Sequence, residues 1–280
     1  AVEDESGGSQ VFAWIGSGQG GGRLAKAFYD RGYKKCIAVN TSKQDLSTLD
    51  LPEAQKLLLD CGEQGAGKDM KRGHDAANRY KQNIFDLMRK TYGSNVGHVF
   101  VCIGAGGGSG SGSTEVLIDV AKKYMKYIGH DDAEKRVGVV LSLPTRGEAG
   151  SPQVAKNARQ VLETTSDLAD QNQISPLIIL DNAKIEKMYK GLTVKKFWPT
   201  VNNTISGLFH VFNVLTGQSS PYTSFDPTDY STVLQCGGVM VMGVAKLKEF
   251  EDEQSVSNAV KANIEKTLLS DVCLLYTSDA

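Results

Sequence analysis

A glycine-rich turn between an apolar run and a helical pattern constrains this chain most. Residues 104–113 contain six glycines, follow the apolar run 99–103, and precede a segment whose apolar residues recur at helical spacing from Val116 to Ala121. Glycine tolerates positive φ and has no Cβ, so several backbone N–H groups of such a turn can point at one anion, while Ser109 and Ser111 add hydroxyl donors. A flexible Gly/Ser linker is the alternative, but a linker is not expected between a buried strand and an amphipathic helix. We therefore predict a phosphate-binding turn.

The composition is that of an ordinary soluble globular protein. The 280 residues carry a net charge of −1, with 40% hydrophobic and 22% charged residues, which suits one large domain or two smaller ones. The near-zero charge gives no indication of nucleic-acid binding, and no apolar run approaches the roughly 20 residues needed to cross a bilayer. Residues 1–10 are acidic and polar, unlike a signal peptide, so we expect a disordered tail on a cytoplasmic protein without membrane insertion.

Cysteine and histidine residues give no sign of a metal site or a disulfide framework. The five cysteines lie far apart, and Cys36 and Cys102 fall inside apolar strand patterns, where thiols usually act as small hydrophobic groups. The four histidines are likewise scattered. We expect neither zinc binding nor disulfides.

Apolar strand patterns alternate with helical patterns over most of the chain. Strands are predicted at residues 11–15, 35–40, 98–103, 137–143 and 177–180, and helices at 23–30, 54–59, 74–92, 114–128, 153–170 and 201–215. This alternation predicts an α/β fold, with a Rossmann-like, mostly parallel sheet, helices on both faces, and a long central helix near the end of a first domain, residues 11–217. A strand at 239–244 and a helix at 255–269 predict that residues 218–272 begin a second, incomplete α+β domain.

A dinucleotide-binding motif matches in part. Gly16, Gly18 and Gly21 fit the pattern G-x-G-x-x-G between a strand and a helix. The next strand, however, ends at Asn40 instead of at the carboxylate that binds the ribose in such proteins. A Rossmann-type NAD-dependent oxidoreductase is therefore kept only as an alternative.

A P-loop motif fails two tests. Gly62, Gly67 and Lys68 fit the pattern G-x-x-x-x-G-K, but Asp69 follows where a P-loop has Ser or Thr for magnesium. The loop also follows a helix-like segment instead of a convincing strand. We therefore do not assign a P-loop.

Three glycine loops, at residues 16–22, 62–67 and 104–112, lie in strand–helix connections or beside one. Loops at the carboxyl ends of parallel strands share one edge of the sheet, so these three can surround a single polyphosphate. The segment from Gly106 to Gly112 reads G-G-G-S-G-S-G and matches the signature loop G-G-G-[TS]-G-[TS]-G of the tubulin/FtsZ family of GTPases. Over residues 11–272 the chain resembles FtsZ-like or TubZ-like tubulin homologues of prokaryotes, archaea or phages.

The resemblance implies that residues 11–217 bind GTP and GDP. Mg²⁺ is expected with them, without identified ligands. For Lys68, a solvated loop lysine is as reasonable an interpretation as a phosphate ligand. The implied phosphate-binding residues are Gly18, Gln19, Gly20 and Gly21 in the first loop, Ala66, Gly67 and Lys68 in the second, and Gly106, Gly107, Gly108, Ser109, Gly110 and Ser111 in the third.

The family places guanine against the start of the central helix, where Asn203 aligns with the residue that pairs with the base. An amide can both donate and accept, so guanine recognition is feasible. Asn202 fits a helix N-cap as well as a ligand. Phe197 or Trp198 is expected to stack on the base, with core packing as the alternative. Two further residues resemble the family's base-or-sugar contact and the acidic residue of its ribose loop, namely Asn182 and Glu148.

Asp226 and Asp229 match the two acids of the family's loop N-x-D-F-A-D and are the catalytic candidates. The resemblance implies that this loop enters the nucleotide site of the next subunit in a filament, where a carboxylate orients the attacking water. Ser224, Pro227 and Thr228 depart from the loop's pattern. A simple turn is the alternative, because Asp and Pro favour turns.

Together these inferences predict a cytoskeletal GTPase that polymerises head to tail with further copies of itself and hydrolyses GTP at subunit junctions. Cell division, DNA partition and other filament roles fit equally, and adaptor proteins are not identified. A nucleotide-binding scaffold without turnover is the main alternative, because the acid loop is altered. We also expect the chain to be truncated at its C-terminus, with residues 273–280 not native.

Overall fold

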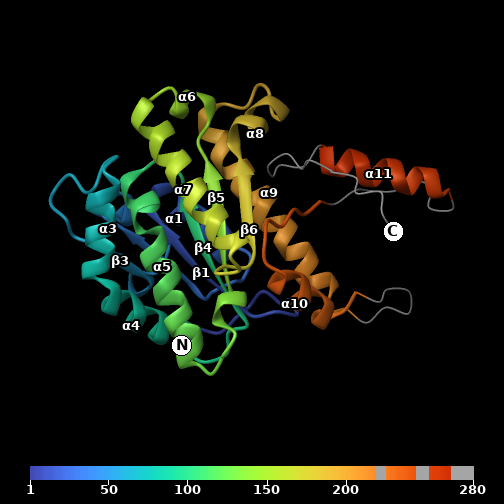
Figure 1. Cartoon of the computed structure of the whole chain (residues 1–280), viewed down its shortest axis with the longest axis horizontal. Coiled ribbons are helices and arrows are strands. Elements are labelled where there is room, and N and C mark those ends of the chain that lie inside the picture. The colour runs from blue at the N-terminus through green and yellow to red at the C-terminus, as the bar shows by residue number, and fades with distance from the viewer. Residues whose placement is uncertain (219–224, 244–251, 266–280) are drawn as a thin grey trace.

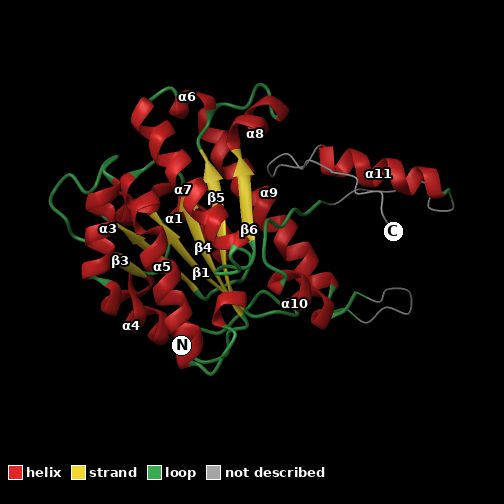
Figure 2. Ribbon diagram, in the orientation of Figure 1, coloured by secondary structure: helices red, strands yellow, loops and turns green. Residues whose placement is uncertain are grey.

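A six-stranded sheet forms the centre of the molecule, and all its strands are parallel. The computed structural model describes residues 1–218, 225–243 and 252–265. Every neighbouring pair of strands is parallel, and Figure 2 shows the strands side by side at the centre. Across the sheet the order is β3 (Lys56–Leu58), β2 (Cys36–Asn40), β1 (Phe12–Ser17), β4 (His98–Gly104), β5 (Val137–Leu143) and β6 (Leu177–Asp181). The predicted Rossmann-like α/β fold is confirmed.

Helices cover both faces of the sheet, as predicted (Figure 1). Along β1, Ala13 and Ile15 enter one core while Phe12 and Trp14 enter the other, because successive residues of a strand point to opposite faces. The first core is completed by α3 (Met70–Arg79), α4 (Lys81–Tyr92), α5 (Gly108–Tyr127) and α7 (Pro152–Asp170). The second is completed by α1 (Gly18–Tyr29), α9 (Val194–Leu215) and α10 (Pro227–Gln235).

Shorter helices occupy the connections. They are α2 (Lys43–Thr48), α6 (Arg146–Ala149), α8 (Asn182–Met188) and the 3-10 helices η1 (Glu53–Gln55) and η2 (Ala133–Lys135). The described part of the predicted helix 255–269 lies in α11 (Glu253–Glu265). Within the described ranges, no helix combines the length and apolar character that a membrane crossing requires.

Two predicted helices have a different structure. Residues 54–59 form η1 and the edge strand β3 instead of a helix, with Leu57 paired to Val39 of β2. A leucine run is compatible with either state, and pairing with a distant strand decides between them. The predicted helix 74–92 is split between α3 and α4, which meet at Tyr80.

Three other helices begin five or more residues earlier than predicted. Helix α1 starts at Gly18 instead of residue 23. The central helix α9 starts at Val194 and contains Pro199, with Phe197 and Val201 packed on Ile185 of α8. Helix α5 starts at Gly108, inside the glycine turn. The early start of α5 matters for function, because it brings a helix N-terminus to the carboxyl edge of the sheet.

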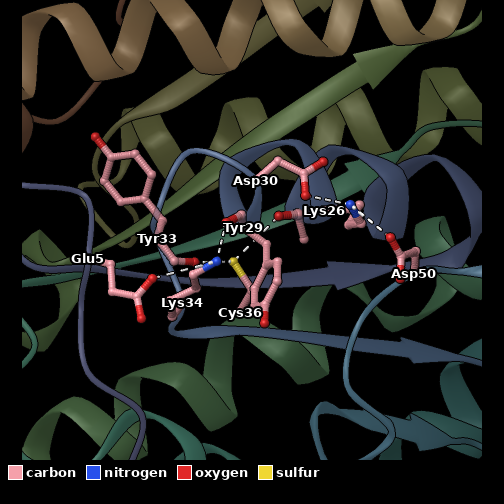
Figure 3. Close-up of polar contacts among 9 residues, drawn as sticks. Glu5, Lys26, Tyr29, Asp30, Tyr33, Lys34, Cys36 and Asp50 are labelled. Carbon is pink, nitrogen blue, oxygen red and sulfur yellow. Dashed lines mark hydrogen bonds and ion pairs between the residues drawn. The ribbon is translucent and has the colours of Figure 1, made fainter.

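The N-terminal segment, expected to be disordered, follows the body of the protein. Val2 N–H donates to Thr91 O at 2.9 Å, Glu5 N–H to Gly32 O at 2.9 Å, and Ser9 N–H to Asn213 O at 2.8 Å. The Glu5 carboxylate also lies 3.8 Å from Lys34 Nζ (Figure 3). Backbone hydrogen bonds to three separate parts of the fold, rather than burial of large apolar groups, hold this polar segment in place.

After α10 the described chain does not form the predicted strand 239–244. Val239 makes an isolated parallel bridge to Leu177, and Met240 N–H donates to Leu177 O at 2.9 Å. The positive φ angles of Gly237 and Gly238, +78° and +66°, turn the chain just before this bridge. Residue 244, residues 266–272 and the expected non-native end at 273–280 lie outside the described residues.

The four described cysteines are free thiols. Cys36 and Cys102 are buried, and burial raises the pKa of both thiols. Both act as small apolar groups in the second core. Cys273 is outside the described residues.

Candidate functional site

A pocket of about 720 Å³ opens at the carboxyl edge of the sheet. Its lining comes from the ends of β1, β2, β4 and β5 and from the residue that follows β6. Parallel strands place these connections on one edge, so loops far apart in sequence meet there. The volume lies within the range of about 300–1,000 Å³ that is usual for ligand sites.

The glycine turn forms the floor of this pocket. Gly106, Gly107, Gly108, Ser109 and Gly110 all line it, and from Gly108 on they are the first turn of α5. Amide groups in a first helical turn have no acceptor within the helix, and the helix dipole favours an anion there. The structure thus brings the predicted phosphate-binding residues of this turn to the pocket, with the exception of Ser111.

Ser111 has a structural role instead of the predicted contact with phosphate. Its hydroxyl accepts from Gly106 N–H at 2.9 Å and is not part of the pocket lining. The side chain thereby closes the turn on itself, which fixes the direction of the amides that precede it.

The first glycine loop supplies a second helix N-terminus. Helix α1 begins at Gly18, whose φ is +72°, and Gly18, Gln19 and Gly20 line the pocket as predicted. Gly21 does not line it. A Cβ at Gly21 would lie 2.1 Å from Cys102 O, so this glycine permits α1 to touch β4 instead of reaching a ligand.

The second glycine loop closes the pocket from another side. Gly67 and Lys68 line it, and Gly67 O accepts from Gly108 N–H at 2.8 Å. Ala66 is buried behind them, where its N–H donates to Thr41 Oγ1 at 2.9 Å. Lys68 Nζ lies 3.1 Å from Ser151 Oγ, which points the ammonium across the pocket mouth.

A buried amide at the far side of the pocket lacks one hydrogen-bond partner. Asn182 is 1% exposed and lines the pocket. Its Nδ2 donates to Ser142 Oγ at 2.8 Å and to Leu143 O at 2.7 Å, whereas its Oδ1 has no partner. Buried polar atoms are nearly always paired in folded proteins, so Oδ1 is an acceptor open to a donor that enters the pocket.

The other predicted base and ribose residues divide into two groups. Glu148 and Trp198 line the pocket. Glu148 Oε2 also accepts from Thr145 N–H at 2.8 Å in the capping box of α6, so this carboxylate is held in place. Phe197 is 7% exposed and packs in a small core with its ring edge toward Trp198, which leaves Trp198 as the aromatic group of the pocket.

Asn203 differs from the expectation. Its Oδ1 accepts from Arg31 Nη2 at 2.8 Å, and the residue is not among those lining the pocket. Asn202 lines the pocket in its place. Successive helix residues differ by about 100° in direction, so a one-residue error in the alignment exchanges the two roles.

Thr41, Arg23, Asp45 and Ser151 are among the pocket residues that were not predicted as ligands. Thr41, directly after β2, hydrogen-bonds to Ser109 and to Ala66, so it joins the second and third glycine loops. Arg23, Asp45 and Ser151 line the pocket. Thr41 directly follows a predicted strand, and this position was the available signal. The other three come from helices or helix caps, whose facing the sequence pattern did not resolve.

The two predicted catalytic acids lie at the amino ends of the strands, on the opposite side of the molecule from the pocket. Asp226 is the N-cap of α10, with Asp229 N–H donating to Asp226 Oδ1 at 2.9 Å and Asp226 N–H to Asp229 Oδ2 at 3.0 Å. Gln10, just before β1, donates to Pro227 O at 2.9 Å, and Phe12, the first residue of β1, packs on Tyr230. Figure 1 accordingly shows α10 at the end of the molecule away from α6. Neither acid contributes to this molecule's own pocket.

The pocket carries both charges and holds no ready-made metal centre. Arg23 and Lys68 supply positive charge, and Asp45 and Glu148 negative charge. In the part of the chain that is described, no three His, Cys, Asp or Glu residues are grouped as metal ligands.

The family follows from comparison with known proteins. Residues 11–190 match the GTPase domain of the tubulin/FtsZ family. The chain belongs to the tubulin/FtsZ family. All three glycine loops lie within the matched residues, and the resemblance inferred from residues 106–112 is confirmed.

Relatives and solved structures within the family are distant. The chain is 23% identical over 264 residues to the tubulin-like protein TubZ of Bacillus cereus, covering 88% of this chain and 58% of that protein. It is 26% identical over 273 residues to cell division protein FtsZ 2 of Methanocaldococcus jannaschii, covering 96% and 65%. The GTPγS-form protofilament of TubZ from Bacillus thuringiensis serovar israelensis superposes with a TM-score of 0.76 at 20% identity, covering 94% of this chain and 71% of that one. The chain thus spans under two thirds of the length of these curated relatives.

Proposed function

We propose that this chain binds GTP in the pocket at the carboxyl edge of the sheet. The observation that carries the proposal is the convergence of three glycine loops and two helix N-termini on one pocket whose far side holds an unpartnered amide oxygen. The N-termini of α1 and α5 suit phosphates. Asn182 Oδ1 suits the N1–H and 2-amino groups of guanine, positions at which adenine has no donor, and Trp198 offers a ring face for stacking.

Within this proposal, the residues divide by the part of the nucleotide they meet. Gly18, Gln19, Gly20, Gly67, Lys68 and residues 106–110 meet phosphates, and Glu148 meets the ribose. Asn202 replaces Asn203 as the amide of α9 that faces the base. Mg²⁺ would neutralise phosphate charge, and Asp45 is the pocket carboxylate that is not committed to a helix cap; one carboxylate plus phosphates is a usual set for this ion.

We further propose that hydrolysis needs a second copy of the chain. Asp226 and Asp229 lie at the edge opposite the pocket, so a head-to-tail neighbour can bring them to the terminal phosphate. There a carboxylate orients the attacking water, and the glycine-loop amides stabilise the charge that develops. The protofilament structures of the TubZ relatives support assembly of this kind.

One observation favours the alternative of a scaffold that binds GTP without turnover. Both acids already accept a backbone N–H in the capping box of α10, one oxygen each. In contrast, the dehydrogenase alternative gains no support, because β2 ends at Asn40, whose Oδ1 accepts from Ser42 N–H at 3.0 Å. No carboxylate stands there to bind a ribose.

Two variants of one residue separate catalysis from structure. Asn is as good an N-cap as Asp, so Asp226→Asn keeps the cap and removes the charge, whereas Asp226→Ala removes both. We expect specific phosphate release from GTP to rise with protein concentration, and Asp226→Asn to abolish release while GTP binding is unchanged. Release that is independent of concentration and unaffected in Asp226→Asn would refute hydrolysis at the junction. GTP binding and assembly without any release would establish the scaffold.

A further inference from the structure

Arg31 joins the C-terminal end of α1 to the middle of the central helix α9. Its Nη2 donates to both Asn203 O and Asn203 Oδ1 at 2.8 Å, and its Nε donates to Ser206 Oγ at 2.8 Å. Ser206 is fully buried, and its hydroxyl donates onward to Asn203 O at 3.1 Å. The planar guanidinium thus spans almost a full turn of α9 with a fixed geometry that an ammonium cannot reproduce.

The two joined helices line different parts of the same pocket. Helix α1 supplies Gly18, Gln19 and Gly20 at its start, and α9 supplies Trp198 and Asn202. Arg31 itself is not part of the lining. A contact between these helices therefore fixes the position of the base-facing residues relative to the phosphate-facing ones.

The contact leaves little freedom for α9. Gly207 follows Ser206, and a Cβ at this position would lie 2.8 Å from Arg31 Nη2, so the absence of a side chain makes room for the guanidinium. Asn203 directly follows Asn202 in the helix. A rotation or shift of α9 that moved Asn202 away from the pocket would break the hydrogen bonds of its neighbour to Arg31.

We infer that Arg31 is a positioning residue for guanine recognition, acting through Asn203 and Ser206 on the orientation of α9. The inference rests on the proposed function, because it assumes that a guanine nucleotide occupies the pocket. It assigns to Asn203 an indirect role: the side chain orients the helix and does not touch the base. Arg31 does not line the pocket and acts only through α9, which carries the base-facing residues. Its loss therefore weakens recognition of the base more than binding of the phosphates.

The test compares GTP with ATP, which share the triphosphate and differ in the base. Titration calorimetry on Arg31→Ala, Asn203→Ala and the double variant gives the affinities. We expect Arg31→Ala to weaken GTP binding roughly 3- to 10-fold, the factor of one misaligned hydrogen bond, while ATP binding changes less than about 2-fold. Asn203→Ala weakens GTP binding less, because the backbone acceptor of Arg31 remains. The double variant binds GTP about as well as Arg31→Ala alone, because both changes break one contact.

Lys34→Ala is the matched control. Lys34 lies three residues from Arg31, carries the same charge and contacts Glu5 and Tyr29 instead of α9 (Figure 3). We expect its GTP affinity to equal that of the unmodified protein. Arg31→Lys, which keeps the charge but not the planar group, is expected to bind GTP with an intermediate affinity and serves in addition if Arg31→Ala folds poorly.

Several results would overturn the inference without overturning the proposal that the pocket binds GTP. Three concern Arg31. They are unchanged GTP affinity in Arg31→Ala, equal losses for GTP and ATP, or losses that add in the double variant. A loss in Asn203→Ala larger than in Arg31→Ala would show that Asn203 contacts the base directly, which also overturns it. The proposed function would fail if the unmodified protein bound ATP and GTP with equal affinity, or bound neither nucleotide. The inference would then fail with it.

Discussion

Asn182 Nδ2 lies 2.8 Å from Ser142 Oγ, so the first residue after β6 is tied to the end of β5. A second bond, to Leu143 O at 2.7 Å, uses the other N–H of the same amide. Both donors of the side chain are thereby committed to the protein, and the remaining acceptor, Oδ1, is buried without a partner. The amide orientation is set by these two contacts and not by a ligand.

This relationship predicts a large effect at Asn182 and a small one at Ser142. Asn182→Leu keeps a similar volume but removes the acceptor, and we expect GTP affinity to fall roughly 5- to 100-fold, the range for loss of a buried hydrogen bond. Ser142→Ala leaves Leu143 O to hold the amide, so a change of less than about 5-fold is expected. Titration calorimetry measures both. Equal affinities for Asn182→Leu and the unmodified protein would exclude Asn182 from the site.

Gly112 and Gly107 test whether the glycine turn serves the fold or the ligand. A Cβ at Gly112 would lie 2.2 Å from Met70 O, where α3 packs on α5, so Gly112→Ala is expected to destabilise the protein by roughly 1–3 kcal/mol or more. Nothing described lies within 4 Å of a Cβ at Gly107, which faces the pocket. Gly107→Ala should therefore preserve stability in urea and weaken nucleotide binding. A destabilised Gly107→Ala together with a Gly112→Ala of unchanged stability would contradict this prediction.

The capping box of α10 predicts different stabilities for two changes at Asp226. Asp226→Ala removes the N-cap, at a cost of about 0.5–2 kcal/mol, whereas Asp226→Asn is expected to cost less than about 0.5 kcal/mol. Urea unfolding of the two variants measures the difference. Equal destabilisation by both would mean that the charge, and not the cap, stabilises the start of α10.

His98 predicts part of the acid sensitivity of the fold. Burial lowers the pKa of His98 to about 3, and its Nε2 lies 2.7 Å from Ser175 O, a carbonyl that can only accept, so Nε2 carries the proton of the neutral ring. The unfolded chain takes up a proton below about pH 6.5 while the folded chain does not, so the stability from this residue is complete above pH 6.5 and is lost as pH falls toward 3. At pH 5 the loss is about 2 kcal/mol relative to pH 8.

His98→Gln can still donate to Ser175 O but does not titrate. Its free energy of unfolding, measured in urea at pH 8 and pH 5, should therefore fall by about 2 kcal/mol less than that of the unmodified protein. Carboxyl groups titrate alike in both proteins and cancel in the comparison. An identical pH dependence would show that His98 is protonated in the folded state.

The strand pattern and the glycine loops could be predicted from the sequence because both depend on local chemistry. Alternation of apolar strands and helices implies a parallel sheet, and a parallel sheet brings its loops to one edge. The short strand β3 could not be predicted, since Leu57 and Leu58 favour a helix as much as a strand until β2 lies beside them. The start of α5 was missed for a related reason: glycine disfavours helices, yet Gly108 and Gly112 lie in the first turns of α5, where the start of α3 packs too close to admit a Cβ.

For several side chains of the site, the orientation of the helix decides whether they point into the pocket. Sequence spacing predicts this orientation poorly. Asn202 and Asn203 are identical in chemistry and adjacent in sequence, and the rotation of α9 decides which one enters the pocket. Gly21 and Ala66 belong to the predicted loops but lie behind the residues that line the pocket. The sequence identified the loops, whereas packing between helices selects the residue within each loop.

The parallel sheet gives the molecule two unlike ends, one with the pocket and one with the paired acids of α10. Copies stacked along the strand direction by the proposed contact have no twofold axis between them, so an open row of this kind has two tips that differ chemically. One tip offers a nucleotide that still lacks its acids, and the other offers acids that lack a nucleotide. Subunits would then be added and lost at different rates at the two tips, and the row would have a defined polarity.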